Sequence, residues 1–207
     1  MISASEALER LKEGNKRFVQ GVRSLEALLS HTRRAELANE QSPLAIVLGC
    51  SDSRVPAEVV FDQGLGDLFV IRVAGNIVAP SQVGSVEFAA SRFGTRLVVV
   101  LGHTQCGAIL ATLEEARSRT TPSPNLQSIV DRIRPSVDTL LATGLPFDSE
   151  ALVRQAVRAN VRASADHLRH GSVLLERLIR DGNLLVVGAE YSLESGEVEF
   201  FDGVPGL

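Results

Sequence analysis

Short apolar runs alternate with amphipathic segments along the chain. Four runs have the length and β-branched content of buried strands: Leu44–Leu48, Leu68–Ile71, Leu97–Leu101 and Leu184–Val187. The segments between them show helical spacing of apolar residues: Val83–Arg92, Ala108–Arg117, Leu126–Leu141 and Glu150–Arg180, the last with an expected break near Gly171. Strands that alternate with helices predict an α/β fold with a mostly parallel central sheet flanked by helices.

The two ends of the chain depart from this alternation. Residues from Ser5 to Val19 have apolar positions at helical spacing behind a serine suited to capping. We therefore expect an N-terminal helical arm over about residues 1–40. The segment Tyr191–Phe200 has two strand-like runs around a Glu-Ser-Gly turn, which predicts an antiparallel C-terminal extension at the sheet edge. A single domain over residues 1–207 accommodates all of these elements.

Composition and charge narrow the classes of partner. The net charge is −4 and the pI is about 5.6, so the charge of the chain gives no reason to expect a nucleic acid as a binding partner. No uncharged apolar stretch approaches the ~20 residues of a membrane helix, and no membrane association is expected. The N-terminus lacks a basic start followed by an apolar run, which leads us to expect a cytoplasmic protein.

The only two cysteines lie where a parallel sheet would bring them together. Cys50 falls two residues after the first strand run, His103 two residues after the third, and Cys106 at the start of the next helix. Ligands bind beyond the carboxyl ends of parallel strands, so these side chains are expected to converge. Zinc accepts thiolate sulfur and imidazole nitrogen, and three protein ligands leave the fourth position open, as in catalytic sites. We therefore expect one Zn²⁺ per chain.

Asp52 and Arg54 lie within four residues of the first expected metal ligand. An ionised aspartate only accepts hydrogen bonds, so Asp52 would take the hydrogen of a zinc-bound hydroxide and direct its lone pair at an electrophile. Arg54 would hold that carboxylate with its planar fork of donors. The plainer interpretation is an exposed ion pair in a turn, which contributes little to stability.

Three ordered motifs resemble one known family. Residues 50–56 (Cys-Ser-Asp-Ser-Arg-Val-Pro), 69–76 (Phe-Val-Ile-Arg-Val-Ala-Gly-Asn) and 102–107 (Gly-His-Thr-Gln-Cys-Gly) resemble the β-class carbonic anhydrases. The resemblance implies zinc ligands and a catalytic dyad at the positions already singled out. It also implies substrate contacts, expected here at Gln41, Phe69, Phe88 and Gly107. The implied assembly is a homodimer with a swapped N-terminal arm, in which Gln41 contacts substrate across the interface; pairing of dimers into tetramers stays open.

The activity that the resemblance implies is reversible hydration of carbon dioxide to bicarbonate and a proton, by attack of zinc-bound hydroxide. One alternative keeps the fold and hydrolyses carbon disulfide or carbonyl sulfide, which are also linear and apolar. Another alternative is a zinc-binding or redox-sensing module built on Cys50 and Cys106. Such a module would require neither Asp52 nor Arg54.

Some members of the family bind bicarbonate beside the metal through a tryptophan, an arginine and a tyrosine, and the aspartate then leaves its arginine for the zinc. Arg72 and Tyr191 match two of those positions, but the tryptophan position is Val47. Valine offers no N–H to an anion. We therefore expect Asp52 to stay paired with Arg54.

Overall fold

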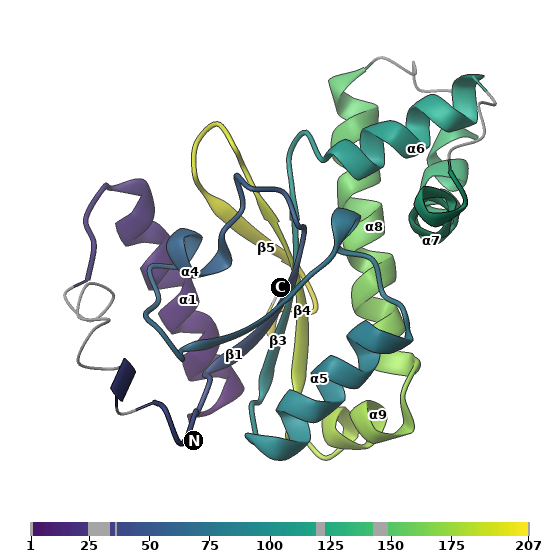
Figure 1. Cartoon of the computed structure of the whole chain (residues 1–207). Helices are drawn as coiled ribbons and strands as arrows, with labels where there is room; N and C mark the ends of the chain where they lie inside the picture. Colours follow the sequence, from purple (N-terminus) through teal and green to yellow (C-terminus); the bar gives the residue numbers. More distant parts are fainter. Residues whose placement is uncertain (1, 25–33, 36, 119–122, 143–148, 207) are drawn as a thin grey trace.

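The computed structural model describes residues 2–24, 34–35, 37–118, 123–142 and 149–206. Five strands form one sheet in the order β2-β1-β3-β4-β5 (Figure 1). The strands β2, β1, β3 and β4 run parallel to one another, and β5 is antiparallel to β4. The strand bounds are β1 (Ala45–Gly49), β2 (Leu68–Arg72), β3 (Leu97–His103), β4 (Leu185–Tyr191) and β5 (Val198–Asp202).

Helices cover both faces of this sheet, which confirms the predicted α/β class. One face carries α1 (Ala4–Val19) and the single turn α4 (Ala57–Val60) (Figure 1). The other face carries α5 (Pro80–Arg92), α8 (Glu150–His170) and α9 (Val173–Arg180), with α6 (Gly107–Ser118) and α7 (Pro124–Leu141) packed beside α8. A short 3-10 helix, η1 (Ala74–Asn76), follows β2.

The central strands read as continuous apolar runs because both of their faces are covered. Every residue of β1 and β3 is buried, as expected for parallel strands between two helical layers. The helical break near Gly171 is also present: Ser172 begins α9 by accepting a hydrogen bond on Oγ from Leu175 N at 3.2 Å. The sequence analysis missed α4 and η1, which are too short to show helical periodicity.

The N-terminal helix is present, but its capping residue differs from the expectation. Ser3, rather than Ser5, caps α1 by accepting a hydrogen bond from Glu6 N at 3.1 Å. Leu8 and Leu11 are buried against the chain's own sheet. Asn15 fixes the helix further, donating from Nδ2 to Gly196 O at 2.9 Å and accepting on Oδ1 from the N–H of β5. The apolar side of α1 is thus covered by the chain's own sheet, and the expected packing of this helix on a partner stays a prediction.

The C-terminal extension is antiparallel, as predicted, with one difference. Tyr191 is the last residue of β4 and pairs with Val198, so the first strand-like run is the end of β4 and not a separate strand.

None of the described helices is both long and apolar enough to cross a membrane.

Candidate metal and active site

Three potential metal ligands converge at the carboxyl ends of two neighbouring strands. Cys50 directly follows β1, His103 is the last residue of β3, and Cys106 directly precedes α6. Pairing of β1 with β3 places the ends of these strands side by side. The two sulfur atoms and the imidazole nitrogen all lie within 4.8 Å of one another. The sheet order thus brings together residues that are distant in sequence.

The state of His103 tests whether this cluster fits a metal. The side chain is fully buried, and Nδ1 lies 2.9 Å from the carbonyl oxygen of Thr104, to which it donates in the neutral tautomer. Nε2 then carries a lone pair, and it has no hydrogen-bond partner among the described residues. A buried ring nitrogen without a partner, oriented by a carbonyl and facing two sulfurs, suits a divalent metal that prefers sulfur and nitrogen ligands.

The two cysteine thiols shift each other's pKa in opposite directions. Cys106 lowers the pKa of Cys50 to about 4, and the Gly75 N–H, 3.3 Å from the Cys50 sulfur, acts in the same direction against burial. Cys50, together with burial, raises the pKa of Cys106. A cation that binds both sulfurs would displace any thiol proton that remains on them.

Asp52 and Arg54 form a bidentate pair beside the cluster. Arg54 donates from Nε to Oδ1 at 2.9 Å and from Nη2 to Oδ2 at 2.7 Å. These bonds hold the pKa of the Asp52 carboxyl well below its usual range, so the group is ionised. Its Oδ2 lies 3.9 Å from Nε2 of His103. The carboxylate therefore faces the space that the imidazole nitrogen also faces, which a simple surface ion pair would not require.

Arg72 contacts the backbone around the first ligand. It donates from Nε to Cys50 O at 3.0 Å and from Nη2 to Asp52 O at 2.6 Å. Val47 is fully buried within β1, and Tyr191 is almost fully buried. Asp52 is paired with Arg54 in the structure, and the expectation that it stays so when bicarbonate binds remains a prediction.

The expected substrate contacts fall into two groups. Gly107 is exposed at the first residue of α6, next to the metal ligands. Phe69 instead lies near the start of β2, where its ring centroid is 6.3 Å from that of Phe88 and 6.1 Å from that of Phe93. Gln41 and Phe93 line the same hollow of about 610 Å³.

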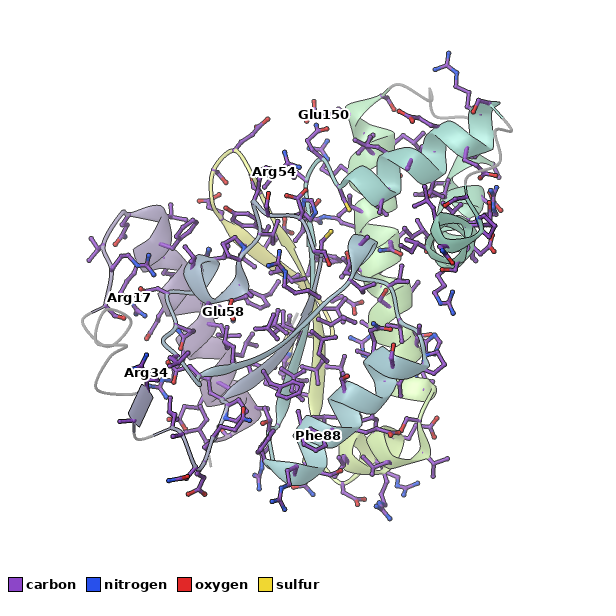
Figure 2. All side chains as sticks on the ribbon, in the orientation of Figure 1. Arg17, Arg34, Arg54, Glu58, Phe88 and Glu150 are labelled. Carbon is purple, nitrogen blue, oxygen red and sulfur yellow. The ribbon has the colours of Figure 1, made fainter. Side chains whose placement is uncertain are left out.

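The second group is far from the metal ligands of its own chain. Phe69 pairs in register with Ile46, four residues before Cys50, which corresponds to about 13 Å along the strand. Figure 2 shows Phe88 and Arg54 at opposite ends of the sheet. A single chain therefore does not bring Gln41, Phe69 and Phe88 together with the metal cluster.

Two backbone contacts to the cluster are absent from the sequence analysis. They are the N–H of Gly75 and the carbonyl of Thr104. Backbone groups leave no side-chain signature. The one available signal was the glycine itself, since its φ of +68° favours a residue without a side chain.

Comparisons with known proteins agree with this geometry. A family model described as carbonic anhydrase matches residues 45–198. Carbonic anhydrase 2 of Mycobacterium tuberculosis is 38% identical over 201 residues, covering 97% of this chain and 94% of that protein. The carbonic anhydrase of Mycolicibacterium smegmatis is 39% identical over 193 residues, covering 93% of this chain and 91% of that protein.

Solved structures agree as well. A β-carbonic anhydrase of Aspergillus fumigatus, 30% identical, has a TM-score of 0.72 and covers 97% of this chain and 91% of its own. Because the family match spans most of the chain and two relatives exceed 30% identity over nearly its whole length, this chain belongs to the β-class carbonic anhydrase family, whose members are carbonate dehydratases.

Proposed function

We propose that this chain catalyses the reversible hydration of carbon dioxide to bicarbonate, with one Zn²⁺ held by Cys50, His103 and Cys106. The observation that carries the proposal is the partnerless Nε2 of buried His103, which faces two cysteine sulfurs beside the Asp52 carboxylate. The names of the most similar relatives support the same substrate.

The metal and the dyad would divide the chemistry. A zinc ion at this site would lower the pKa of a coordinated water toward neutrality and so supply the nucleophile. Asp52, ionised and acceptor-only, would accept the O–H hydrogen of that nucleophile and so turn an oxygen lone pair toward the carbon of carbon dioxide. Arg54 fixes the carboxylate through two parallel hydrogen bonds. Gly107, exposed at the start of α6, would contact a substrate oxygen.

The remaining substrate contacts would come from a second copy of the chain. Among the described strands, β2 has a neighbour on one side only, and Phe69 and Val70 on it are only half-buried. An open strand edge is a natural pairing surface. Two-fold antiparallel pairing of β2 with β2 would place the start of one strand beside the end of the other.

Such pairing would also bring the correct face to the site. Phe69 packs on the face of the sheet covered by α5 and α8, and the Cys50 cluster packs against α8 on that face. A two-fold axis perpendicular to a continuous sheet keeps equivalent faces on the same side. The start of the partner's β2, which carries Phe69, would then lie beside the end of this chain's β2, where Arg72 contacts Cys50 and Asp52. We therefore propose that Gln41, Phe69 and Phe88 line the metal site of the partner.

Stopped-flow hydration of carbon dioxide, combined with metal analysis, tests the proposal. We expect one zinc per chain and rapid hydration that zinc removal abolishes and zinc addition restores. Parallel assays with carbon disulfide and carbonyl sulfide separate the substrate classes. Zinc binding without turnover of any of these three would instead favour a binding or redox-sensing module.

A further inference from the structure

A buried polar network joins α8 to the turn that follows β2. Asn160 is 2% exposed and donates from Nδ2 to Gly75 O at 2.8 Å. Ser164, one helical turn later, donates from Oγ to Asn76 O at 3.0 Å. Two consecutive carbonyls of η1 are thus held by side chains of a helix that is remote in sequence.

The turn needs such support because its backbone is unusual. Gly75 has a φ of +68° and Asn76 a φ of +44°, both in the left-handed region. That conformation costs free energy for a residue with a side chain, and it persists when the surroundings hold it. A Cβ at position 75 would also lie 2.8 Å from Cδ1 of Ile133. A side chain at position 75 would therefore be strained, which favours glycine there.

The far side of the same glycine contacts the metal cluster. Its N–H donates to Cys50 Sγ at 3.3 Å. A hydrogen bond from a backbone N–H stabilises the charged form of a sulfur and fixes the direction of its lone pairs. The orientation of Gly75 therefore bears directly on this metal ligand.

Simple packing does not explain the asparagine. The neighbouring residues of α8 that face the interior include Val157, Val161 and Leu168, all buried and apolar. A buried amide in that row is unfavourable unless it forms its hydrogen bonds. Asn160 forms one with the carbonyl that belongs to the glycine at the metal cluster.

We propose that Asn160 is a positioning residue for the metal centre: by holding the Gly75 carbonyl, it directs the Gly75 N–H at the Cys50 sulfur. Ser164 plays a smaller part by holding the adjacent carbonyl of Asn76. This role rests on the proposed metal site, since it concerns one of that site's ligands.

The test compares Asn160→Leu with Thr95→Val. Leucine keeps a similar volume and removes the donor to Gly75 O. Thr95 is also buried and donates to a backbone carbonyl, Pro43 O at 3.0 Å, but it lies at the other end of the sheet. Thr95→Val therefore measures the loss of an equivalent buried hydrogen bond without a link to the cluster. Zinc affinity is measured by chelator competition, and the Cys50 sulfur is followed by the thiolate charge-transfer absorption of the cobalt-substituted protein.

We expect Asn160→Leu to weaken zinc binding by about 10- to 100-fold, the usual effect of losing a partner of a metal ligand. The charge-transfer band should move to longer wavelength, because a sulfur without its hydrogen bond donates more strongly. Thr95→Val should change neither quantity. Ser164→Ala should change zinc affinity and the position of the cobalt band in the same directions as Asn160→Leu, but by smaller amounts. If Asn160→Leu does not fold, Ser164→Ala alone tests the proposal.

Zinc affinity within two-fold of that of Thr95→Val, with an unmoved cobalt band, would overturn the role of Asn160. That outcome differs from failure of the proposed function, in which the unaltered protein itself binds no zinc.

Discussion

The two ends of the sheet differ in what they offer to a substrate. At the carboxyl ends of β1 and β3, buried sulfur and nitrogen atoms face a carboxylate held by an arginine. At the start of β2, three phenylalanine rings gather at the surface, and Phe88 is 55% exposed. The first end holds the potential metal ligands and the Asp52–Arg54 pair, and the second end holds an exposed aromatic cluster.

This difference supports the proposal that the two ends serve different active sites. Carbon dioxide is apolar and requires both a nucleophile and an apolar surface around it. Residues that the family resemblance implies for a single site are separated here by the length of a strand. The proposed pairing of two chains through β2 would resolve the separation, since it would place the aromatic end of one chain at the metal end of the other.

The largest expected effect comes from removing a metal ligand. Cys106→Ser should reduce bound zinc from one per chain to near zero and lower carbon dioxide hydration by more than about 100-fold. The reason is that the site loses one of its three protein ligands. Metal analysis and stopped-flow rates on the same samples measure this, with Thr95→Val as the control. Hydration at the normal rate by a zinc-free Cys106→Ser protein would show that catalysis does not require the metal cluster.

The next effect concerns the aromatic end. The double change Gln41→Ala and Phe69→Ala should lower kcat/KM by about ten-fold or more while zinc stays at one per chain, because we propose that these side chains contact substrate and not metal. Phe18→Ala is a suitable control, since that ring is half-buried on the opposite face of the sheet. Equal losses in both variants would point to a general packing defect instead.

The pairing edge can be altered directly. Val70→Lys places a charge on the open edge of β2 and should convert dimers into monomers that keep zinc but hydrate carbon dioxide several-fold more slowly. Val173→Lys introduces the same change at a position that is 87% exposed on α9 and should leave assembly intact. Sedimentation velocity measures the outcome. A fully active Val70→Lys monomer would contradict the use of two chains per site.

The smallest effect is the pH dependence of the Asp52–Arg54 pair. Since the folded pKa of Asp52 is lowered, the pair's stabilisation is complete above the unfolded pKa of about 3.9 and is lost as the pH falls below it. The difference in unfolding free energy between the unaltered protein and Asp52→Asn should therefore be small and constant from pH 5 to 8. Urea denaturation from pH 8 down to about pH 3 measures it, and a difference that does not decrease as the pH falls below about 4 would show that the pKa is not lowered.

Features dictated by burial were predictable from the sequence. The runs of β1 and β3 were placed within two residues because both strands are buried along their whole length, whereas β4 extends four residues beyond the predicted Val187. The convergence of Cys50 with His103 followed from counting residues past neighbouring strand ends. Counting residues along the strands in the same way would have predicted that Phe69 lies far from Cys50, since Phe69 lies at the start of its strand.

Other features depend on surfaces that periodicity does not identify. The pattern of α1 shows which side is apolar, but it does not show whether the chain's own sheet or a partner covers it. The contact from Asn160 to Gly75 joins residues 85 positions apart, and a lone asparagine in a helix gives no sign of such a bond. Roles that act through backbone groups become visible only in three dimensions.

The central claim, that each active site combines the metal end of one chain with the aromatic end of another, has one direct test. Cys106→Ser chains are co-expressed with Gln41→Ala/Phe69→Ala chains under different tags, and the mixed dimer is purified. One of its two sites would then have an intact metal cluster and intact aromatic residues, so we predict about half of the activity of the unaltered dimer. A mixed dimer no more active than the Gln41→Ala/Phe69→Ala homodimer would contradict the account.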